Sequence, residues 1–478
     1  MTPKTRLAAG VRAGHDANAS EIPAAPEAEC AVAAGPSARS GEDRCPGALR
    51  PFAAEDGLII RARVPGGGVS LGTLRTLLQI GADYGTPRIQ LTTRGNLQVR
   101  GLPDPLPDDV AERLADAGLL PSLTHERARN ILAAPTSAVL RERARELDRM
   151  LIARPALARL PGRFLMLLTD SSGLGLNERF DVAYVDAGDG SGVLLLGRQD
   201  PFERQLESLD LARGRQETAQ RPAMGSQVSD RERGNNRASA EESRRGSPRP
   251  LRLGRVVASD DALEAMLDVA AQFLTERDDE RVWNIRDLPD SSPLYEGFAW
   301  GEVPGDPADN GTGDATTEPA GNPTGGAAGA IGASLGSGVY GADLVAGVPL
   351  GLLEAEHLTA LEAVTDHVVI TAWRSVLVPG GAAYADQLAA AGLIVDEASA
   401  WGRISACTGA PYCGRAQSET LSLARECVET IGAELPRLHL VGCGRRCGEP
   451  RGEHLTVVGA QSLADVRAAI AATTVASD

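Results

Sequence analysis

Four cysteines in the last third of the sequence have spacings that suit metal or cluster ligands. They form two pairs, C-x5-C in "CTGAPYC" and C-x3-C in "VGCGRRC" (Cys407, Cys413, Cys443 and Cys447). Thiolates bind soft metals, and the glycines and proline around each pair favour tight loops whose amides can point at an anion. Three interpretations fit this pattern: chance clustering of buried cysteines, a zinc tetrad, and a [4Fe–4S] cluster. The pattern favours the cluster.

The remaining candidates for chemistry are weaker. Cys427 lies in "LSLARECVETIG", whose amphipathic pattern predicts a helix with this cysteine facing the core, whereas Cys30 and Cys45 have no ligand partner at motif spacing. The glycine-rich "SSGLGLNERFD" lacks G-x-G-x-x-G spacing and predicts a β-turn rather than a nucleotide site. No metal-ligand spacing occurs among the six histidines, which we interpret as structural (His15, His125, His357, His367, His439 and His454).

The composition narrows the class of protein. With 478 residues and 42% apolar residues, the chain can build two or three domains with real cores. The formal charge of −16 argues against nucleic acid or a membrane surface as the main partner, because both require a basic face. No window of 18 consecutive apolar residues occurs, and the first residues lack the apolar core of a signal peptide. We therefore expect a cytoplasmic protein whose thiols stay reduced.

Three segments are poor in large apolar residues and predict flexible regions. They are a disordered tail at 1–43, an insert at about 213–250 and a linker at 301–335. None can bury enough apolar surface to offset the entropy lost on ordering. Four ordered blocks remain, near 50–120, 125–290, 336–400 and 400–475.

The first and third blocks share a pattern. Each has a strand, a Val-Pro turn, a helix, and a second strand interrupted by an arginine, Arg94 in "LTTRGNLQVRG" and Arg374 in "VVITAWRSVLVPG". A strand–helix–strand unit leaves one sheet face uncovered, so two copies are expected to pack as a pseudo-twofold pair. Two related arginines favour a large ligand with anionic groups on opposite sides. Either arginine alone would more simply be a solvated charge at a strand end.

These motifs together resemble the nitrite/sulfite reductase superfamily. The resemblance implies an α+β fold with two ferredoxin-like half-domains, 44–120 and 336–400, and two cofactor or substrate domains, 121–290 and 401–478. It implies that the four cysteines hold a [4Fe–4S] cluster and that Cys447 faces or bridges the macrocycle site. Basic residues of this superfamily bind the eight carboxylates of sirohaem, and the matching positions here are Arg94, Arg129, Arg163 and Arg374.

Within the superfamily, "RCPGALRPFAAEDGLIIRARVP" and "ITAWRSVLVPG" are most similar to the precorrin-3B synthase family. This resemblance implies O2-dependent hydroxylation of precorrin-3A at C20, with formation of a γ-lactone, in aerobic cobalamin biosynthesis. It also implies a mononuclear non-haem iron with unassigned ligands, and electrons from NADH or from a reductase or ferredoxin. No individual catalytic residue is assigned.

One stretch discriminates between oxygenase and reductase. Reductases of the superfamily gather cations over the sirohaem iron in an R-K-F-K stretch, where "RLPGRFLMLL" has Arg163 for the first lysine and Leu165 for the second. The lost cation removes stabilisation of bound sulfite or nitrite. A sirohaem-dependent assimilatory sulfite or nitrite reductase is therefore the second hypothesis, and an Fe–S electron-transfer module the third. The chain also departs from the synthase family, whose second cysteine motif is usually of the type Ser-Gly-Cys-Ala-Lys-Gly-Cys. Here Arg445 and Arg446 make this loop bulkier and more positive.

Overall fold

The computed structural model describes residues 43–198, 252–301, 334–450 and 454–475, and these belong to one compact unit that spans 40–478. The predicted insert at 213–250 lies outside the described residues. Of the predicted tail at 1–43 and the predicted linker at 301–335, the structure describes only residues 43, 301, 334 and 335.

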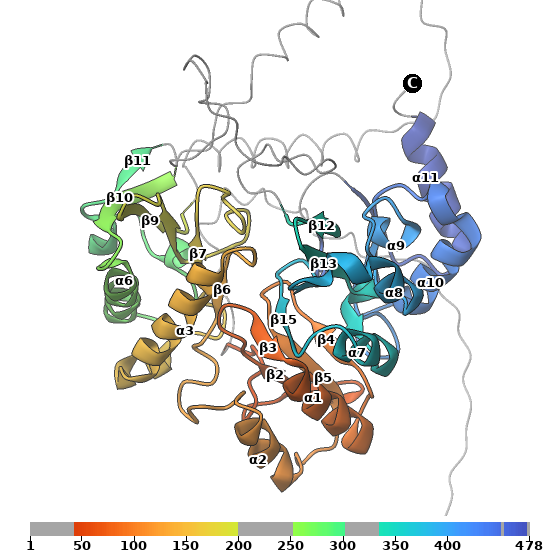
Figure 1. The fold of residues 1–478 in the computed structure, drawn as a ribbon, viewed down its shortest axis with the longest axis horizontal. Coiled ribbons are helices and arrows are strands. Elements are labelled where there is room, and N and C mark those ends of the chain that lie inside the picture. The colour runs from red at the N-terminus through yellow and green to blue at the C-terminus, as the bar shows by residue number, and fades with distance from the viewer. Residues whose placement is uncertain (1–42, 199–251, 302–333, 451–453, 476–478) are drawn as a thin grey trace, which may run out of the picture. The chain divides into compact units, whose positions relative to one another are not determined.

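The first half-domain is an antiparallel sheet covered by a helix (Figure 1). Helix α1 (Leu71–Tyr84) begins at Ser70, whose hydroxyl accepts a hydrogen bond from the Thr73 amide. It buries Leu71, Leu74 and Leu78 on one face. Helix α2 (Asp108–Asp116) follows the sheet. In spatial order, the sheet strands of this half-domain are β1 (Phe52–Ala54), β2 (Gly57–Ala62), β5 (Leu97–Leu102) and β4 (Ile89–Leu91).

The second half-domain repeats this arrangement. Helix α7 (Ala355–Glu362) corresponds to α1 and packs against it, and α8 (Ala385–Ala390) packs on α7. The sheet strands, again in spatial order, are β12 (Gly338–Tyr340), β13 (Asp343–Gly347), β16 (Ser375–Val378) and β15 (His367–Ile370).

The two half-domains exchange one short strand each. Strand β14 (Leu352–Leu353) of the second half-domain pairs with β4, and β3 (Gly68–Ser70) of the first pairs with β15. The two five-stranded sheets therefore have the same order, each completed by a strand of the other. This reciprocal pairing confirms the predicted duplication and gives the pair its pseudo-twofold character.

In each half-domain, the second strand that the sequence predicts, the one interrupted by an arginine, is in fact a hairpin of two strands. The Thr92 amide donates to the Asn96 carbonyl (2.9 Å), and the Thr371 amide donates to the Ser375 carbonyl (3.0 Å). Matching these turns aligns Arg374 (φ 57°) with Gly95 (φ 61°), both in the left-handed region. Arg94 then aligns with Trp373. The expectation that Arg94 and Arg374 occupy equivalent positions is thus wrong by one residue.

The block between the half-domains forms a six-stranded sheet. Its first three strands are parallel and the others antiparallel. Helices α3 (Ala138–Ile152) and α6 (Ala262–Glu276) pack on it and bury an extensive apolar core. The strands are β6 (Ile131–Ala133), β7 (Met166–Thr169), β8 (Val182–Asp186), β9 (Ser191–Leu196), β10 (Arg252–Ala258) and β11 (Ala299–Gly301).

The last block is a parallel three-stranded sheet with its own core. Cys427 is fully buried there, on α10, as its helical pattern predicts. Within the described residues, every helix falls short of the length and apolar character needed to cross a membrane. The elements are α9 (Ala400–Arg403), β17 (Ile404–Ala406), α10 (Thr420–Ile431), β18 (Leu438–Val441), β19 (Leu455–Val458) and α11 (Leu463–Val475).

Candidate functional site

Parallel pairing in the last sheet brings the two cysteine motifs together. Strands β17 and β18 are neighbours, and the first motif begins directly after β17 while the second begins just after β18. The Cys407 amide donates to the Leu440 carbonyl (2.9 Å), which ties the start of the first loop to β18. The Gly442 amide points at the Cys407 sulfur (3.3 Å), whereas the Thr420 hydroxyl, 3.7 Å from that sulfur, donates to the Cys407 carbonyl (2.7 Å). Donors directed at a thiolate sulfur stabilise its negative charge.

The Cys447 thiol lies within electrostatic reach of Cys407, Cys413 and Cys443. Burial, and then the other three cysteines, raise the pKa of the Cys447 thiol, whereas Arg445 acts in the opposite sense. Three cysteines near Cys447, with the Gly442 amide directed at the Cys407 sulfur, fit the donor set of a [4Fe–4S] cluster. Among the described residues, no three His, Cys, Asp or Glu side chains converge as ligands of a single metal ion.

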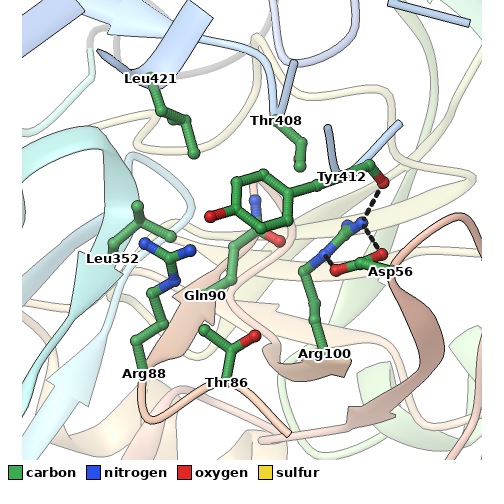
Figure 2. Close-up of a pocket in the computed structure, with 9 residues that line it drawn as sticks. All are labelled: Asp56, Thr86, Arg88, Gln90, Arg100, Leu352, Thr408, Tyr412 and Leu421. Carbon is green, nitrogen blue, oxygen red and sulfur yellow. Dashed lines mark hydrogen bonds and ion pairs between the residues drawn. The ribbon is translucent and has the colours of Figure 1, made fainter. Parts of the chain in front are cut away.

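The first half-domain holds the first cysteine loop in place (Figure 2). Arg100 pairs with Asp56 (2.8 Å) and donates to the backbone carbonyl of Tyr412 (2.9 Å), the residue before Cys413. The Arg88 guanidinium lies 5.3 Å from the centre of the Tyr412 ring, a cation–π distance. Strands β4 and β5, with their flanking residues, thus fix the loop from outside the sheet that carries it.

Arg374 connects both cysteine loops. Its guanidinium donates to the carbonyl of Ala406, just before Cys407, and to that of Gly448, just after Cys447, each at 3.4 Å. Burial lowers the pKa of Arg374, and Cys407 opposes this shift. A Cβ atom at Gly351 would lie 2.8 Å from the Arg374 Cδ, and one at Gly448 would overlap the guanidinium. The two glycines therefore form the channel through which the side chain passes.

A cleft of about 640 Å³ opens beside Arg374 and the second cysteine loop. Its lining includes more basic than acidic side chains and two aromatic ones, Trp373 and Trp401. The charged side chains are Arg179, Arg374, Arg437, Arg445, Arg446, Glu178, Glu397 and Glu449. A cavity of this size is within the range of sites that bury an organic ligand.

Two of the cleft arginines are available for an anion. Arg437 pairs with Glu397 (3.1 Å), and Arg446 pairs with Glu449 (3.4 Å). Arg179 and Arg445 make no hydrogen bond or ion pair with any described residue. Since a guanidinium fork matches carboxylate geometry, these two side chains can each bind a carboxylate of a ligand.

The other arginines expected from the sequence have different surroundings. Arg94 donates to the carbonyl of Arg163, and its neighbour Thr93 lines the cleft. The half-exposed Arg163 lies over the Trp283 ring (4.9 Å) and near the Asp43 carboxylate (3.5 Å).

Arg129 does not reach the cleft. It is buried and makes two hydrogen bonds of 2.7 Å to the Asp148 carboxylate on α3. Because α3 already supplies a matching carboxylate, the structure gives Arg129 the role of an internal ion pair instead of a ligand-binding cation.

Sequence reasoning missed Arg179. It belongs to "SSGLGLNERFD", which was expected to form a turn, and the structure shows turns there. The turns carry Arg179 to the cleft. The sequence signal that could have identified Arg179 as a candidate site residue is its position directly after a glycine-rich turn.

The comparisons with known proteins agree with this architecture. The family model described as the nitrite/sulfite reductase ferredoxin-like half domain matches residues 52–117. Precorrin-3B synthase from Sinorhizobium sp is 38% identical over 90 residues, which span 18% of this chain and only 20% of that relative. The solved structure of the Mycobacterium tuberculosis NirA protein matches with a TM-score of 0.50 and 18% identity, covering 82% of this chain and 69% of that one. The chain therefore has a nitrite/sulfite reductase-like architecture, and its residues 52–117 are similar to the ferredoxin-like half-domain of that family.

Proposed function

We propose that the chain is a tetrapyrrole mono-oxygenase, a precorrin-3B synthase that hydroxylates precorrin-3A at C20 and forms the γ-lactone in aerobic cobalamin biosynthesis. The observation that carries this proposal is the arginine-lined cleft of about 640 Å³ next to the cysteine loops. The local similarity to the Sinorhizobium sp synthase supports it.

The cleft suits an anionic macrocycle. Arg179 and Arg445 supply guanidinium groups without internal partners, Arg374 supplies the wall next to the cysteines, and Trp373 offers an apolar ring surface. A buried carboxylate without a partner costs several kcal/mol, so a ligand with eight carboxylates requires such cations. We assign Arg94 and Arg163 to the edge of the same site, because Thr93 lines the cleft.

The cysteine loops supply the electron path in this proposal. Cys407, Cys413, Cys443 and Cys447 would hold a [4Fe–4S] cluster, which passes single electrons when bound. Mono-oxygenation places one atom of O2 in the product and releases the other as water, so two electrons and two protons must come from a donor. We propose NADH, or a reductase or ferredoxin, as that donor. A mononuclear non-haem iron remains part of the proposal without assigned ligands.

A sirohaem-dependent sulfite or nitrite reductase is the second candidate, because the architecture is similar to NirA over 82% of the chain. The surroundings of Leu165 favour the oxygenase. Leu165 is 1% exposed in the core of the six-stranded sheet, at the position where the reductases carry a lysine. The chain therefore presents no cation from this position to a small anion.

Anaerobic binding of precorrin-3A tests the proposal. We expect Arg179→Gln and Arg445→Gln each to weaken binding by about 1.5–3 kcal/mol, the worth of a charged hydrogen bond. Arg149→Gln, on the exposed face of α3, serves as a control with the same change of charge. Absence of binding to the wild-type protein, or unchanged affinity in both cleft variants, would refute the proposed site.

A further inference from the structure

A second cavity, of about 500 Å³, is lined in part by five arginines that the proposed reaction does not use. Its wall combines the segment before β1, the end of the short helix Pro155–Arg159 and the C-terminal end of α6. Among the described lining residues only Asp43 and Glu280 are acidic. The basic ones are Arg44, Arg50, Arg127, Arg159 and Arg277. Such local excess of positive charge contrasts with the net charge of −16 for the whole chain.

The two acidic residues offset only part of the charge of the five arginines. The Asp43 carboxylate accepts hydrogen bonds from the Cys45 amide (3.1 Å) and the Gly162 amide (2.6 Å), and it also lies near Arg163. The guanidinium groups of Arg50, Arg159 and Arg277 have no hydrogen-bond or ion-pair partner among the described residues.

Cations crowd one another at this wall. Burial, and then the positive charge of Arg159, lower the pKa of Arg277, and the opposing effect of Glu280 and Asp43 does not cancel this shift. An anion bound between the two guanidinium groups would relieve this repulsion.

Two more arginines, Arg61 and Arg63, lie next to a lining residue of the cavity. Cys45 lines the cavity, and its sulfur lies 3.2 Å from a guanidinium nitrogen of Arg61 and 3.5 Å from one of Arg63. Arg63 is 1% exposed, its Nε and Nη1 atoms have no hydrogen-bond partner, and burial lowers its pKa to about 10. A buried cation without a carboxylate raises the positive potential of the neighbouring cavity.

We propose that this basic cavity binds a small multivalent oxyanion, a molecule that carries phosphate or carboxylate groups. Guanidinium forks recognise both groups with paired hydrogen bonds. A small molecule is favoured over an acidic protein or nucleic acid, because the strongly negative chain repels a large polyanion while a cavity of this size admits a compact one. The cavity shares no lining residue with the tetrapyrrole cleft, so its existence does not depend on the proposed function.

Calorimetric titration of the full chain tests the proposal, with inorganic pyrophosphate and citrate as probes. We expect Arg159→Gln and Arg277→Gln each to weaken binding by about tenfold, whereas Arg149→Gln, outside the cavity, leaves it unchanged. Arg445→Gln, in the cleft, should also leave it unchanged, which separates this site from the first. Arg159 is exposed, so its replacement should preserve the fold, which the thermal unfolding midpoint will verify.

Binding of pyrophosphate alone would support the site with a phosphate ligand, and binding of citrate alone would support it with a carboxylate ligand. The proposal is overturned if neither probe binds at low ionic strength. It is equally overturned if the Arg159→Gln/Arg277→Gln double variant binds both probes as tightly as the wild type.

Discussion

Arg374 takes a left-handed backbone conformation so that its side chain can pass between two glycines to the cysteine loops. A non-glycine residue in this region of φ and ψ is strained, and surrounding contacts must hold it there. Those contacts are the hydrogen bonds to the carbonyls of Ala406 and Gly448. Arg374 therefore positions both pairs of cysteines as well as lining the cleft.

Replacement of Gly448 should disrupt this arrangement. Gly448 has a φ of 76°, and a Cβ there would overlap the Arg374 guanidinium. We expect Gly448→Ala to destabilise the folded second loop by about 1–3 kcal/mol and to lower the iron content of the purified protein. Gly444→Ala, in the same loop, should keep full iron content, because no atom lies within 4 Å of the place that its methyl group would take. Equal iron content in both variants would contradict the role given to Arg374.

The assignment of the cluster ligands gives a second prediction at this scale. Cys443→Ser should lose most of the iron and acid-labile sulfide, because a serine hydroxyl is a poor ligand for a [4Fe–4S] cluster. Cys427→Ser, fully buried on α10 and away from the two motifs, should retain the metal if the variant folds. Iron and sulfide analysis measures both. Retention of a full cluster by Cys443→Ser together with its loss from Cys427→Ser would reverse the assignment.

Some residues of the candidate site could be predicted from the sequence, and others could not. The cysteines could be found because the two members of each pair are close along the chain, at C-x5-C and C-x3-C spacing. Arg179 and Arg445 share a cleft although they are far apart in sequence, and only the tertiary structure joins them. Arg129 was misassigned because its partner, Asp148, belongs to the next helix and no local pattern shows the ion pair.

At the scale of single elements, the pattern of apolar residues predicted the helices α1, α7 and α10. Helix α1 buries its leucines as its 3.6-residue period indicates, and Cys427 faces the core of the last block. The hairpins were harder to predict. The segment from Arg88 to Leu102 reads as one apolar strand, but Gly95 takes a positive φ and lets the chain reverse between β4 and β5.

His357 should make the stability of α7 depend on pH. Its Nδ1 accepts a hydrogen bond from the Glu354 amide (3.1 Å) at the start of the helix, and burial lowers the pKa of the imidazole. The unfolded chain then binds a proton at a pH where the folded chain does not. Stability from this group is therefore complete above the ordinary histidine value, near 6.5, and is lost as the pH falls below it.

Denaturant unfolding between pH 5 and 8 tests the role of His357. The wild-type free energy of unfolding should decrease toward pH 5 more steeply than that of His357→Gln, which has no group that titrates in this range. Identical slopes for both proteins would show that His357 does not contribute. His367 is exposed on β15, so His367→Gln removes a histidine outside the core and serves as the matched control.

For the whole molecule, the exchanged strands make the two half-domains one folding unit. Their apolar side chains also share a core, in which Leu74 and Leu97 of the first half-domain join Leu344 and Leu358 of the second. Repetition in the sequence predicted two copies packed as a pair. It could not predict the exchange, because β3 and β14 have only three and two residues and no recognisable strand pattern.

A proline in β3 should therefore perturb the other half-domain. Val69→Pro cannot donate to the ladder that β3 forms with β15, and we expect a loss of about 1–3 kcal/mol of stability. Hydrogen exchange measured by mass spectrometry should show faster exchange in β15, about 300 residues away in sequence. Faster exchange confined to the residues next to 69 would contradict the exchange of strands.

The central claim is that the architecture of an anion reductase here binds a tetrapyrrole as substrate and oxygenates it. Its most direct test is incubation of the purified protein with precorrin-3A and a reductant without oxygen, followed by admission of ¹⁸O2 and mass spectrometry of the product. We expect the hydroxylated lactone to form only after oxygen enters, with label from O2 in the product. Purification with stoichiometric sirohaem, together with reduction of sulfite or nitrite in the absence of oxygen, would contradict the claim and establish the reductase.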